Sequence, residues 1–239
     1  MSSNTMNSGI FDPKLIQPRV LQTLEEGAQL DLSTESARQF LKKSVDKKID
    51  VVILYVDING STRMSLTLPA IKFARIIQVF SQEMSIAVIN SGGHVFKYVG
   101  DAVIAFFPAE HPKQAAANAI ECAKAMTEAF TKYINPSFQM YGLPAVTVKV
   151  AFEYGNVLVV PYGKRSRTSH VDIVGATISI VAKMLPDAKP THIITGQAIY
   201  NLSSSGAWHK NFLGLNEKTA EWSYVDETSG QPYKLFLVK

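Results

Sequence analysis

The sequence predicts an α+β protein whose core elements follow the order β-α-β-β-α-β. Short runs of β-branched and aromatic residues alternate with two long segments of helical periodicity, and Gly-containing turns separate them. This order is typical of a ferredoxin-like, or split βαβ, core, in which helices pack on a mainly antiparallel sheet. No repeat or low-complexity linker interrupts it. We therefore expect one main domain over residues 46–239, preceded by an N-terminal arm and short helix over 1–45.

Local patterns predict each element of the first half. The first thirty or so residues are mixed and rich in Ser and Asn, which indicates an arm packing on a neighbour. Thr34–Val45 carries helix formers. Ile49–Val56 is a nearly continuous β-branched and aromatic run, typical of a central strand. Apolar residues then recur at helical spacing over Pro69–Asn90, and Gly92–Gly93 ends this helix.

The second half continues with a hairpin, because Val95–Val99 and Ala102–Phe107 are separated only by Gly100–Asp101. A long helix is predicted from Pro112 to about Ile134. The later elements are expected as a strand pair, Val146–Phe152 and Asn156–Val160, around Tyr154–Gly155; a strand at His170–Val174; a helix from Gly175 to Pro186; and final strands at Ile193–Ile194, Trp222–Val225 and Tyr233–Val238.

Composition limits the possible classes of function. The chain has 239 residues, 46% hydrophobic and 18% charged, which excludes a disordered or collagen-like protein. A net charge of +4 suits an anionic substrate but is too small to predict nucleic-acid binding. The single cysteine, Cys122, excludes an internal disulfide and a Cys-based zinc site, and we expect it to be buried. No apolar run reaches ~20 residues and no signal peptide is recognisable, so we expect a cytoplasmic protein without a membrane partner.

Two aspartates stand at predicted strand ends. Asp57 follows the central strand, and Asp101 lies in the turn of the hairpin. Neighbouring strands would bring both carboxylates to one point, where they suit Mg²⁺ or Mn²⁺ bridging substrate phosphates. The alternative interpretation is that both are ordinary turn residues.

The residues directly after Asp57 are small and polar and lead into a helix. Exposed amides of Gly60, Ser61 and Thr62 could hold phosphate oxygens. No GxxxxGK[ST] motif occurs in the chain, which argues against a P-loop kinase or GTPase.

Four segments together carry a family resemblance: VDINGST, GGHVFKYVGDAVIAFF, VKVAFEYGNV and VDIVGATISIVAKM. In order and spacing they resemble the catalytic domain of class III nucleotidyl cyclases, over roughly Ile49–Gly196. The resemblance implies a head-to-tail homodimer with two composite sites, which converts a nucleoside triphosphate to a 3′,5′-cyclic nucleotide and pyrophosphate.

The resemblance also implies roles for individual residues. Asp57 and Asp101 match the aspartates that hold two divalent ions, Mn²⁺ or Mg²⁺, and the carbonyl of Ile58 matches a further ligand. Lys97 and Asp172 match the base-contacting positions, which in the family lie across the dimer interface from the metal-binding aspartates.

Two positions depart from the family pattern. Ser179 stands where the family has Asn, and Lys183 stands where it has the transition-state Arg. Lysine keeps the charge but lacks the bidentate fork of arginine. The usual lysine for the terminal phosphates has no clear match, with Lys218 and the Lys164–Arg167 run as the only suggestions. An inactive nucleotide-binding module therefore stays an alternative.

The base is not fixed by hydrogen bonding alone. The pair of Lys97 and Asp172 fits adenine, and it also fits the donor–acceptor edges of cytosine and uracil. Tyr55 precedes Asp57 by two residues on the same strand, so it could narrow the base pocket toward a pyrimidine. The alternative is that Tyr55 is a packed core aromatic.

The overall pattern is most similar to the bacterial pyrimidine cyclases of antiphage Pycsar systems, on the strength of a compact domain, Ser and Lys on the transition-state helix, and the terminal TSGQPYKLFLV strand. This resemblance implies synthesis of cyclic UMP or cyclic CMP, with uridylate cyclase slightly favoured, and a separate effector that the product activates. An adenylate cyclase is the main alternative.

Overall fold

A mixed, mostly antiparallel sheet forms the centre of the computed structural model, which describes residues 12–28, 34–163, 170–203, 209–215, 224–226 and 229–239. Within these ranges the sheet has eight strands in the order β2-β3-β1-β4-β6-β8-β7, and β5 pairs with β4. The strands are β1 (Lys48–Ile58), β2 (His94–Val99), β3 (Ala102–Pro108), β4 (Val148–Tyr162), β5 (His170–Val174), β6 (Ile193–Gly196), β7 (Phe212–Gly214) and β8 (Leu235–Val238). The predicted α+β class and the β-α-β-β-α-β order are confirmed.

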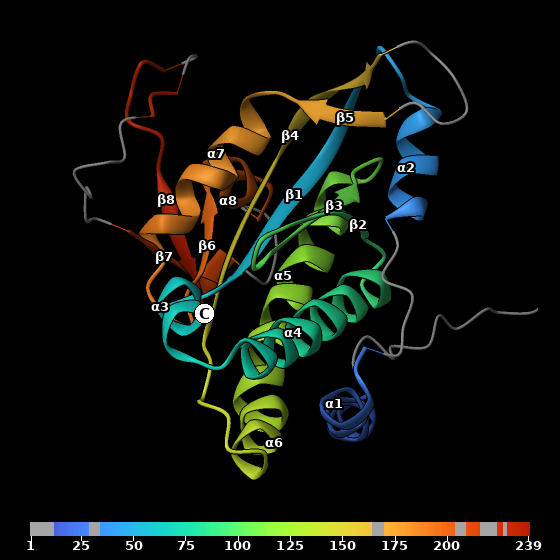
Figure 1. The fold of residues 1–239 in the computed structure, drawn as a ribbon. Coiled ribbons are helices and arrows are strands. Elements are labelled where there is room, and N and C mark those ends of the chain that lie inside the picture. The colour runs from blue at the N-terminus through green and yellow to red at the C-terminus, as the bar shows by residue number, and fades with distance from the viewer. Residues whose placement is uncertain (1–11, 29–33, 164–169, 204–208, 216–223, 227–228) are drawn as a thin grey trace, which may run out of the picture.

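Helices cover both faces of the sheet (Figure 1). On one face lie α4 and α5, with α1 packed against α4, whereas α2 and α7 lie on the other face together with β5. The helices are α1 (Pro13–Glu26), α2 (Glu35–Lys42), α3 (Ser61–Thr67), α4 (Ala70–Asn90), α5 (Pro112–Ala129), α6 (Asn135–Met140), α7 (Ala176–Met184) and α8 (Gln197–Ser203), with a π-helical turn at Phe130–Ile134 and 3-10 turns at Leu185–Asp187 and His209–Asn211. No described helix is long and apolar enough to cross a membrane.

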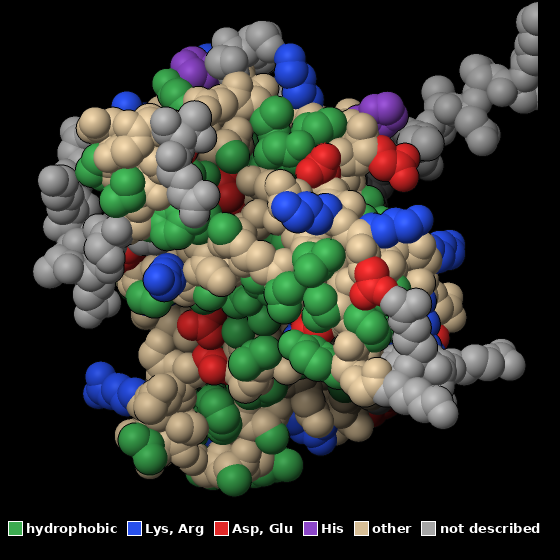
Figure 2. Space-filling view, turned by 90° about the horizontal axis from the view of Figure 1, so that it is seen from above, with side chains coloured by type: hydrophobic (Ala, Val, Ile, Leu, Met, Phe, Trp, Pro, Cys, Tyr) green, Lys and Arg blue, Asp and Glu red, His purple; other side chains and the backbone are tan. Residues whose placement is uncertain are grey.

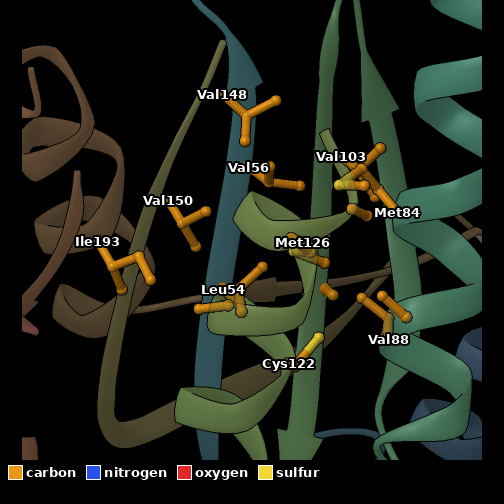
Figure 3. Close-up of a cluster of buried hydrophobic side chains, with 14 of the residues drawn as sticks. Leu54, Val56, Met84, Val88, Val103, Cys122, Met126, Val148, Val150 and Ile193 are labelled. Carbon is orange, nitrogen blue, oxygen red and sulfur yellow. The ribbon is translucent and has the colours of Figure 1, made fainter. Parts of the chain in front are cut away.

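The central strand β1 separates two hydrophobic cores, because successive side chains of a strand point to opposite faces. Leu54 and Val56 lie in the core beneath α4 and α5, as Figure 3 shows, and Cys122 of α5 is buried there as expected. Burial raises the pKa of the Cys122 thiol to about 12. Ile53 and Tyr55 belong to the opposite core, and β1 therefore carries the residues that build a site on that face.

The N-terminal segment differs from the expected arm. Its described part forms α1, whose Ile16 and Val20 are fully buried in the main core. Arg19 of α1 forms a bidentate ion pair with the buried Glu83 of α4, at 2.7 and 3.1 Å. The mixed composition concealed an amphipathic helix that contains an internal proline, Pro18.

The expected strand pair around Tyr154–Gly155 is also wrong. β4 runs without a turn through both residues. Gly155 serves a different purpose, because a Cβ atom there would lie 2.4 Å from Oγ1 of Thr177 in α7. The glycine therefore allows α7 to pack closely on the sheet.

The C-terminal region is only partly as predicted. Trp222 lies outside the described residues, while Val225 forms a single β-bridge with Pro232, and the last strand begins only at Leu235. Helices α6 and α8 and strand β7 were not expected, because each is short and carries weak periodicity.

Replacement of Arg19 by alanine tests how far α1 belongs to the domain. The carboxylate of Glu83 is fully buried, whereas Arg19 keeps 26% of its side chain exposed. Because the variant leaves a buried charge without its partner, we expect the free energy of unfolding to fall by about 3 kcal/mol, measured by urea denaturation. The double variant Arg19→Met/Glu83→Leu should recover most of the loss, and an unchanged midpoint in the single variant would contradict the assignment.

Candidate active site

The two aspartates singled out in the sequence lie close together where β1 ends and β3 begins. Asp57 is the last but one residue of β1 and stands opposite Ala102 of β3. Asp101 lies in the turn between β2 and β3, next to Gly100, whose φ of 61° permits the tight reversal. The hairpin thus returns directly beside the end of the central strand.

The two carboxyl groups interact. Burial and then the neighbouring carboxyl of Asp101 raise the pKa of Asp57 to about 7. Oδ2 of Asp101 is buried and accepts no hydrogen bond from any described residue. A divalent cation fits this arrangement, since it would relieve both the repulsion and the unpaired oxygen. The described residues contain no cluster of three or more His, Cys, Asp or Glu side chains, so water, main-chain or substrate oxygens would supply the other ligands.

A pocket of about 440 Å³ opens beside these carboxyl groups. The sheet contributes Tyr55, Asp57, Lys97 and Asp101 to its lining, and Ile178 and Ala182 of α7 contribute to the opposite wall. Figure 2 looks onto this side of the molecule, where hydrophobic side chains gather in the middle of the face with charged side chains between them. Asp57, Asp101 and Lys97 of one chain therefore line the same pocket, whereas the resemblance implies that the base-contacting residues act across a dimer interface, and Asp172 is not among the lining residues.

The base-contacting candidates form an ion pair. Nζ of Lys97 contacts Oδ2 of Asp172, whose Oδ1 accepts a hydrogen bond of 2.8 Å from the amide of Ile173. Because β3 and β1 separate β2 from β4 in the sheet, this contact requires the β4–β5 hairpin to bend over the sheet face. Burial, and then the charge of Asp172, raise the pKa of Tyr55, which lines the pocket together with Lys97.

The remaining candidates take different positions. Ser179 and Lys183 are exposed on α7 and do not line the pocket of their own chain, although Ile178 and Ala182, each one residue earlier, do. The Ser179 hydroxyl donates to the carbonyl of Gly175 at 3.3 Å. The side chains that would act on the substrate from α7 thus point away from this pocket.

The turn after β1 is formed as the sequence suggests. Ile58 is buried, Gly60 has φ 77°, and α3 begins with Ser61, followed by the exposed Thr62. None of these residues lines the pocket. Lys218 and the Lys164–Arg167 run lie outside the described residues.

Sequence reasoning missed one basic residue. Lys149 of β4 stands directly opposite Asp57 in the β1–β4 register, and its positive charge acts to lower the pKa of Asp57. The residue is half-buried and shares the face of Tyr55 and Asp57. The alternation of VKVAF indicates that Lys149 points to the opposite face from the valines on either side of it. Only the register of β4 against β1 shows that this lysine lies beside the carboxyl groups.

Comparison with known proteins agrees with this geometry. Residues 44–219 match the family described as adenylate and guanylate cyclase catalytic domain. An adenylate cyclase of Anabaena cylindrica is 27% identical over 184 residues, covering 74% of this chain and 35% of that protein. A cytidylate cyclase of Escherichia coli is 25% identical over 172 residues, covering 66% of this chain and 37% of that protein. The chain therefore spans about a third of the length of these relatives.

The fold agrees as well. The crystal structure of the adenylyl cyclase CyaB from P. aeruginosa superposes with a TM-score of 0.67 at 19% identity, covering 81% of this chain and 95% of that one. Since the family match extends over most of the sequence and the same fold surrounds the paired aspartates, the chain belongs to the family of adenylate and guanylate cyclase catalytic domains.

Proposed function

We propose that the chain is a nucleotidyl cyclase, which converts a nucleoside triphosphate to its 3′,5′-cyclic nucleotide and pyrophosphate. The ribose 3′-oxygen loses its proton and attacks the α-phosphorus, and the bond to the pyrophosphate leaving group breaks. The observation that carries this proposal is the pocket, which is lined by the paired carboxyl groups and by Lys97, and Lys97 in turn contacts Asp172 to form a pair suited to a base edge.

Asp57, Asp101 and the carbonyl of Ile58 are the groups that would hold two Mg²⁺ or Mn²⁺ ions. When bound, such ions neutralise the triphosphate and make the 3′-hydroxyl more acidic. Lys149 lies beside Asp57 and would hold the triphosphate by its charge, and the amides of Gly60, Ser61 and Thr62 follow on the same edge. Lys97 would donate to an acceptor on the base, while Asp172 would accept from the adjacent donor.

The exposed side chains of α7 favour a homodimer. Ser179 and Lys183 face away from their own pocket, so their proposed action on the ribose and the α-phosphate requires a site on a second copy. The head-to-tail arrangement implied by the resemblance would supply two such composite sites. A dimer then provides each site with a positive charge that a single chain leaves at its surface.

For the base, we propose a pyrimidine, with UTP slightly ahead of CTP. Tyr55 lines the pocket and its phenol lies near Asp172, where it reduces the space for a purine. The cytidylate cyclase among the relatives supports this choice, whereas the adenylate cyclase keeps ATP as the alternative. On the resemblance of the sequence to pyrimidine cyclases of antiphage systems, the product would be a messenger for a separate effector in bacterial antiphage defence.

A non-catalytic nucleotide-binding module is the second candidate function. It is favoured by one observation, namely that serine and lysine replace the asparagine and arginine of the family on α7. Such a module would bind a triphosphate without releasing pyrophosphate.

A panel of single nucleotides tests the main proposal. Purified protein with Mn²⁺ should release pyrophosphate from UTP or CTP, and mass spectrometry should identify the cyclic product. Asp101→Asn should abolish turnover, because it removes one of the two metal-binding carboxylates. Cyclic AMP as the dominant product would refute pyrimidine selection, and binding without turnover of all four triphosphates would favour the non-catalytic module.

Tyr55→Ala tests the steric basis of selection. Removal of the ring enlarges the pocket beside Asp172, so we expect the ratio of kcat/KM for ATP over UTP to rise at least tenfold. Tyr55→Phe is the matched control, since it keeps the ring and loses only the hydroxyl. An unchanged ratio in the alanine variant would mean that Tyr55 is simply a packed aromatic.

Lys149→Ala tests the residue that the sequence alone did not reveal. Loss of one charged contact to phosphate should raise KM about tenfold, with pyrophosphate binding weakened to a similar degree. Lys149→Arg should restore most of the affinity, because it keeps the charge. If KM is unaffected while Asp101→Asn is inactive, Lys149 does not contact the substrate.

A further inference from the structure

Glu153 of β4 is a buried carboxyl group to which three segments of the chain bind. Its Oε1 accepts hydrogen bonds from the amides of Tyr154, at 2.8 Å, and of Ile199 in α8, at 3.0 Å. Its Oε2 accepts from the hydroxyl of Tyr233, at 2.8 Å, and that hydroxyl accepts from the amide of Ala198, at 3.3 Å. One carboxyl group thus links β4, α8 and the segment that leads into β8.

The space around this carboxyl group is closely filled. Glu153 is 1% exposed. A Cβ atom on Gly196, the last residue of β6, would lie 1.8 Å from Oε2 of Glu153 and 2.6 Å from the ring of Tyr233. β6 therefore needs a glycine at this point, and the carboxyl group is in direct contact with three neighbouring elements.

The second buried glutamate provides an internal comparison. Glu83 is also fully buried, and Arg19 neutralises it through two hydrogen bonds. Glu153 has no ion pair with any described residue, and its partners there are two amides and a phenol. Tyr233 is the titratable group that faces Glu153, while α8 and β6 present main-chain groups to it. Asp226 is the next charged group, and its charge acts on Tyr233. Within the described part of the chain, an ionised Glu153 is therefore a buried charge without a counter-ion.

Proton binding at Glu153 changes the hydrogen bonding. Burial raises the pKa of Glu153 to about 7 against the opposing effect of its hydrogen bonds, whereas burial and the charge of Glu153 keep Tyr233 protonated by raising its pKa. An ionised carboxylate only accepts, so Tyr233 donates to it. A neutral carboxyl group carries its own proton and can donate to the Tyr233 oxygen instead. The Glu153–Tyr233 contact can thus reverse its direction near neutral pH.

The contact is connected to the pocket through β6. This strand pairs with β8 and contacts α7, and Tyr233 and Leu235 belong to the same buried cluster as Val181 and Met184 of α7. α7 forms the wall of the pocket opposite the sheet. If the C-terminal segment is held less firmly, the packing of the α7 wall therefore loosens as well.

We propose that Glu153 is a proton-operated clamp: with its proton it holds the C-terminal segment, residues 229–239, against β6 and α7, and loss of the proton loosens this segment together with the α7 wall. The sign follows from linkage. Between the ordinary glutamate pKa and about 7 the unfolded chain is ionised while the folded chain is neutral, so folding stability falls as the pH rises through this window and levels off above it.

Unfolding at a series of pH values tests the clamp without any nucleotide. From pH 5 to pH 8 the unfolding equilibrium constant of the native chain should rise roughly fiftyfold relative to that of Glu153→Gln. Glutamine mimics the neutral acid, since it can accept the two amide hydrogen bonds and donate to Tyr233. Glu83→Gln is the matched control, since it removes the other fully buried glutamate and leaves Glu153 in place, so the native pH slope should persist. Equal slopes for the native chain and Glu153→Gln would overturn the proposal.

Hydrogen exchange locates the effect. After correction for intrinsic rates, amides of β8 and α7 should lose protection relative to β1 between pH 6 and pH 8 in the native chain and not in Glu153→Gln. If that variant fails to fold, Tyr233→Phe decides: it removes a donor to the ionised form, so the transition should move to higher pH. Unchanged relative protection in the native chain, or an unshifted transition in Tyr233→Phe, would refute the clamp. Neither outcome bears on cyclase activity, since no nucleotide is present.

Discussion

The close approach of two carboxyl groups at the end of β1 is the constraint on which the rest of the site depends. Asp57 is held by a central strand paired on both sides, and Asp101 by a hairpin that cannot reverse elsewhere without breaking its register. Burial, and then the neighbouring carboxyl of Asp101, raise the pKa of Asp57, and the strand pairing keeps the two groups together in the folded chain. Such a site is preorganised for a cation, because folding has already brought the ligand groups together.

The chain deals with buried carboxyl groups in three ways. Glu83 receives a guanidinium from α1, and the paired aspartates face a pocket that a cation and a triphosphate could enter. Glu153 receives only uncharged donors from the residues that the structure describes. These differences follow from the cost of burying a charge, which an ion pair offsets, a bound cation offsets on binding, and a proton removes altogether. One functional group, the carboxylate, thus fits a structural role at Glu83, the proposed catalytic role at the paired aspartates and the proposed titrating role at Glu153, according to its surroundings.

The sequence was sufficient for the elements that carry strong local signals. The run over β1, the Gly-Asp turn and the two long helices are each specified by neighbouring residues, and the aspartates could be placed together from them. Partners that depend on register could not be predicted: Lys149 faces Asp57 only once β4 is aligned with β1, and Glu153 meets Tyr233 across 80 positions of sequence. Gly155 was misinterpreted for the same reason, because the close neighbour that requires it, Thr177, belongs to a distant helix.

Under the proposed function, selection of the base would depend on the volume of the pocket more than on hydrogen bonding. The lysine–aspartate pair offers one donor and one acceptor, and adenine, cytosine and uracil can each complement it. In the free chain these two side chains satisfy each other, so any base must compete with an existing ion pair and gains little net energy from the exchange. Discrimination then rests on what fits beside the pair. Tyr55 projects from the strand that also fixes Asp57, so a base too large for the space beside this ring would shift the ribose and its 3′-oxygen relative to the paired aspartates. Under the proposed function, a rigid strand that carries both the aromatic wall and the carboxylate proposed to bind metal would turn a small steric difference into a difference in reactivity.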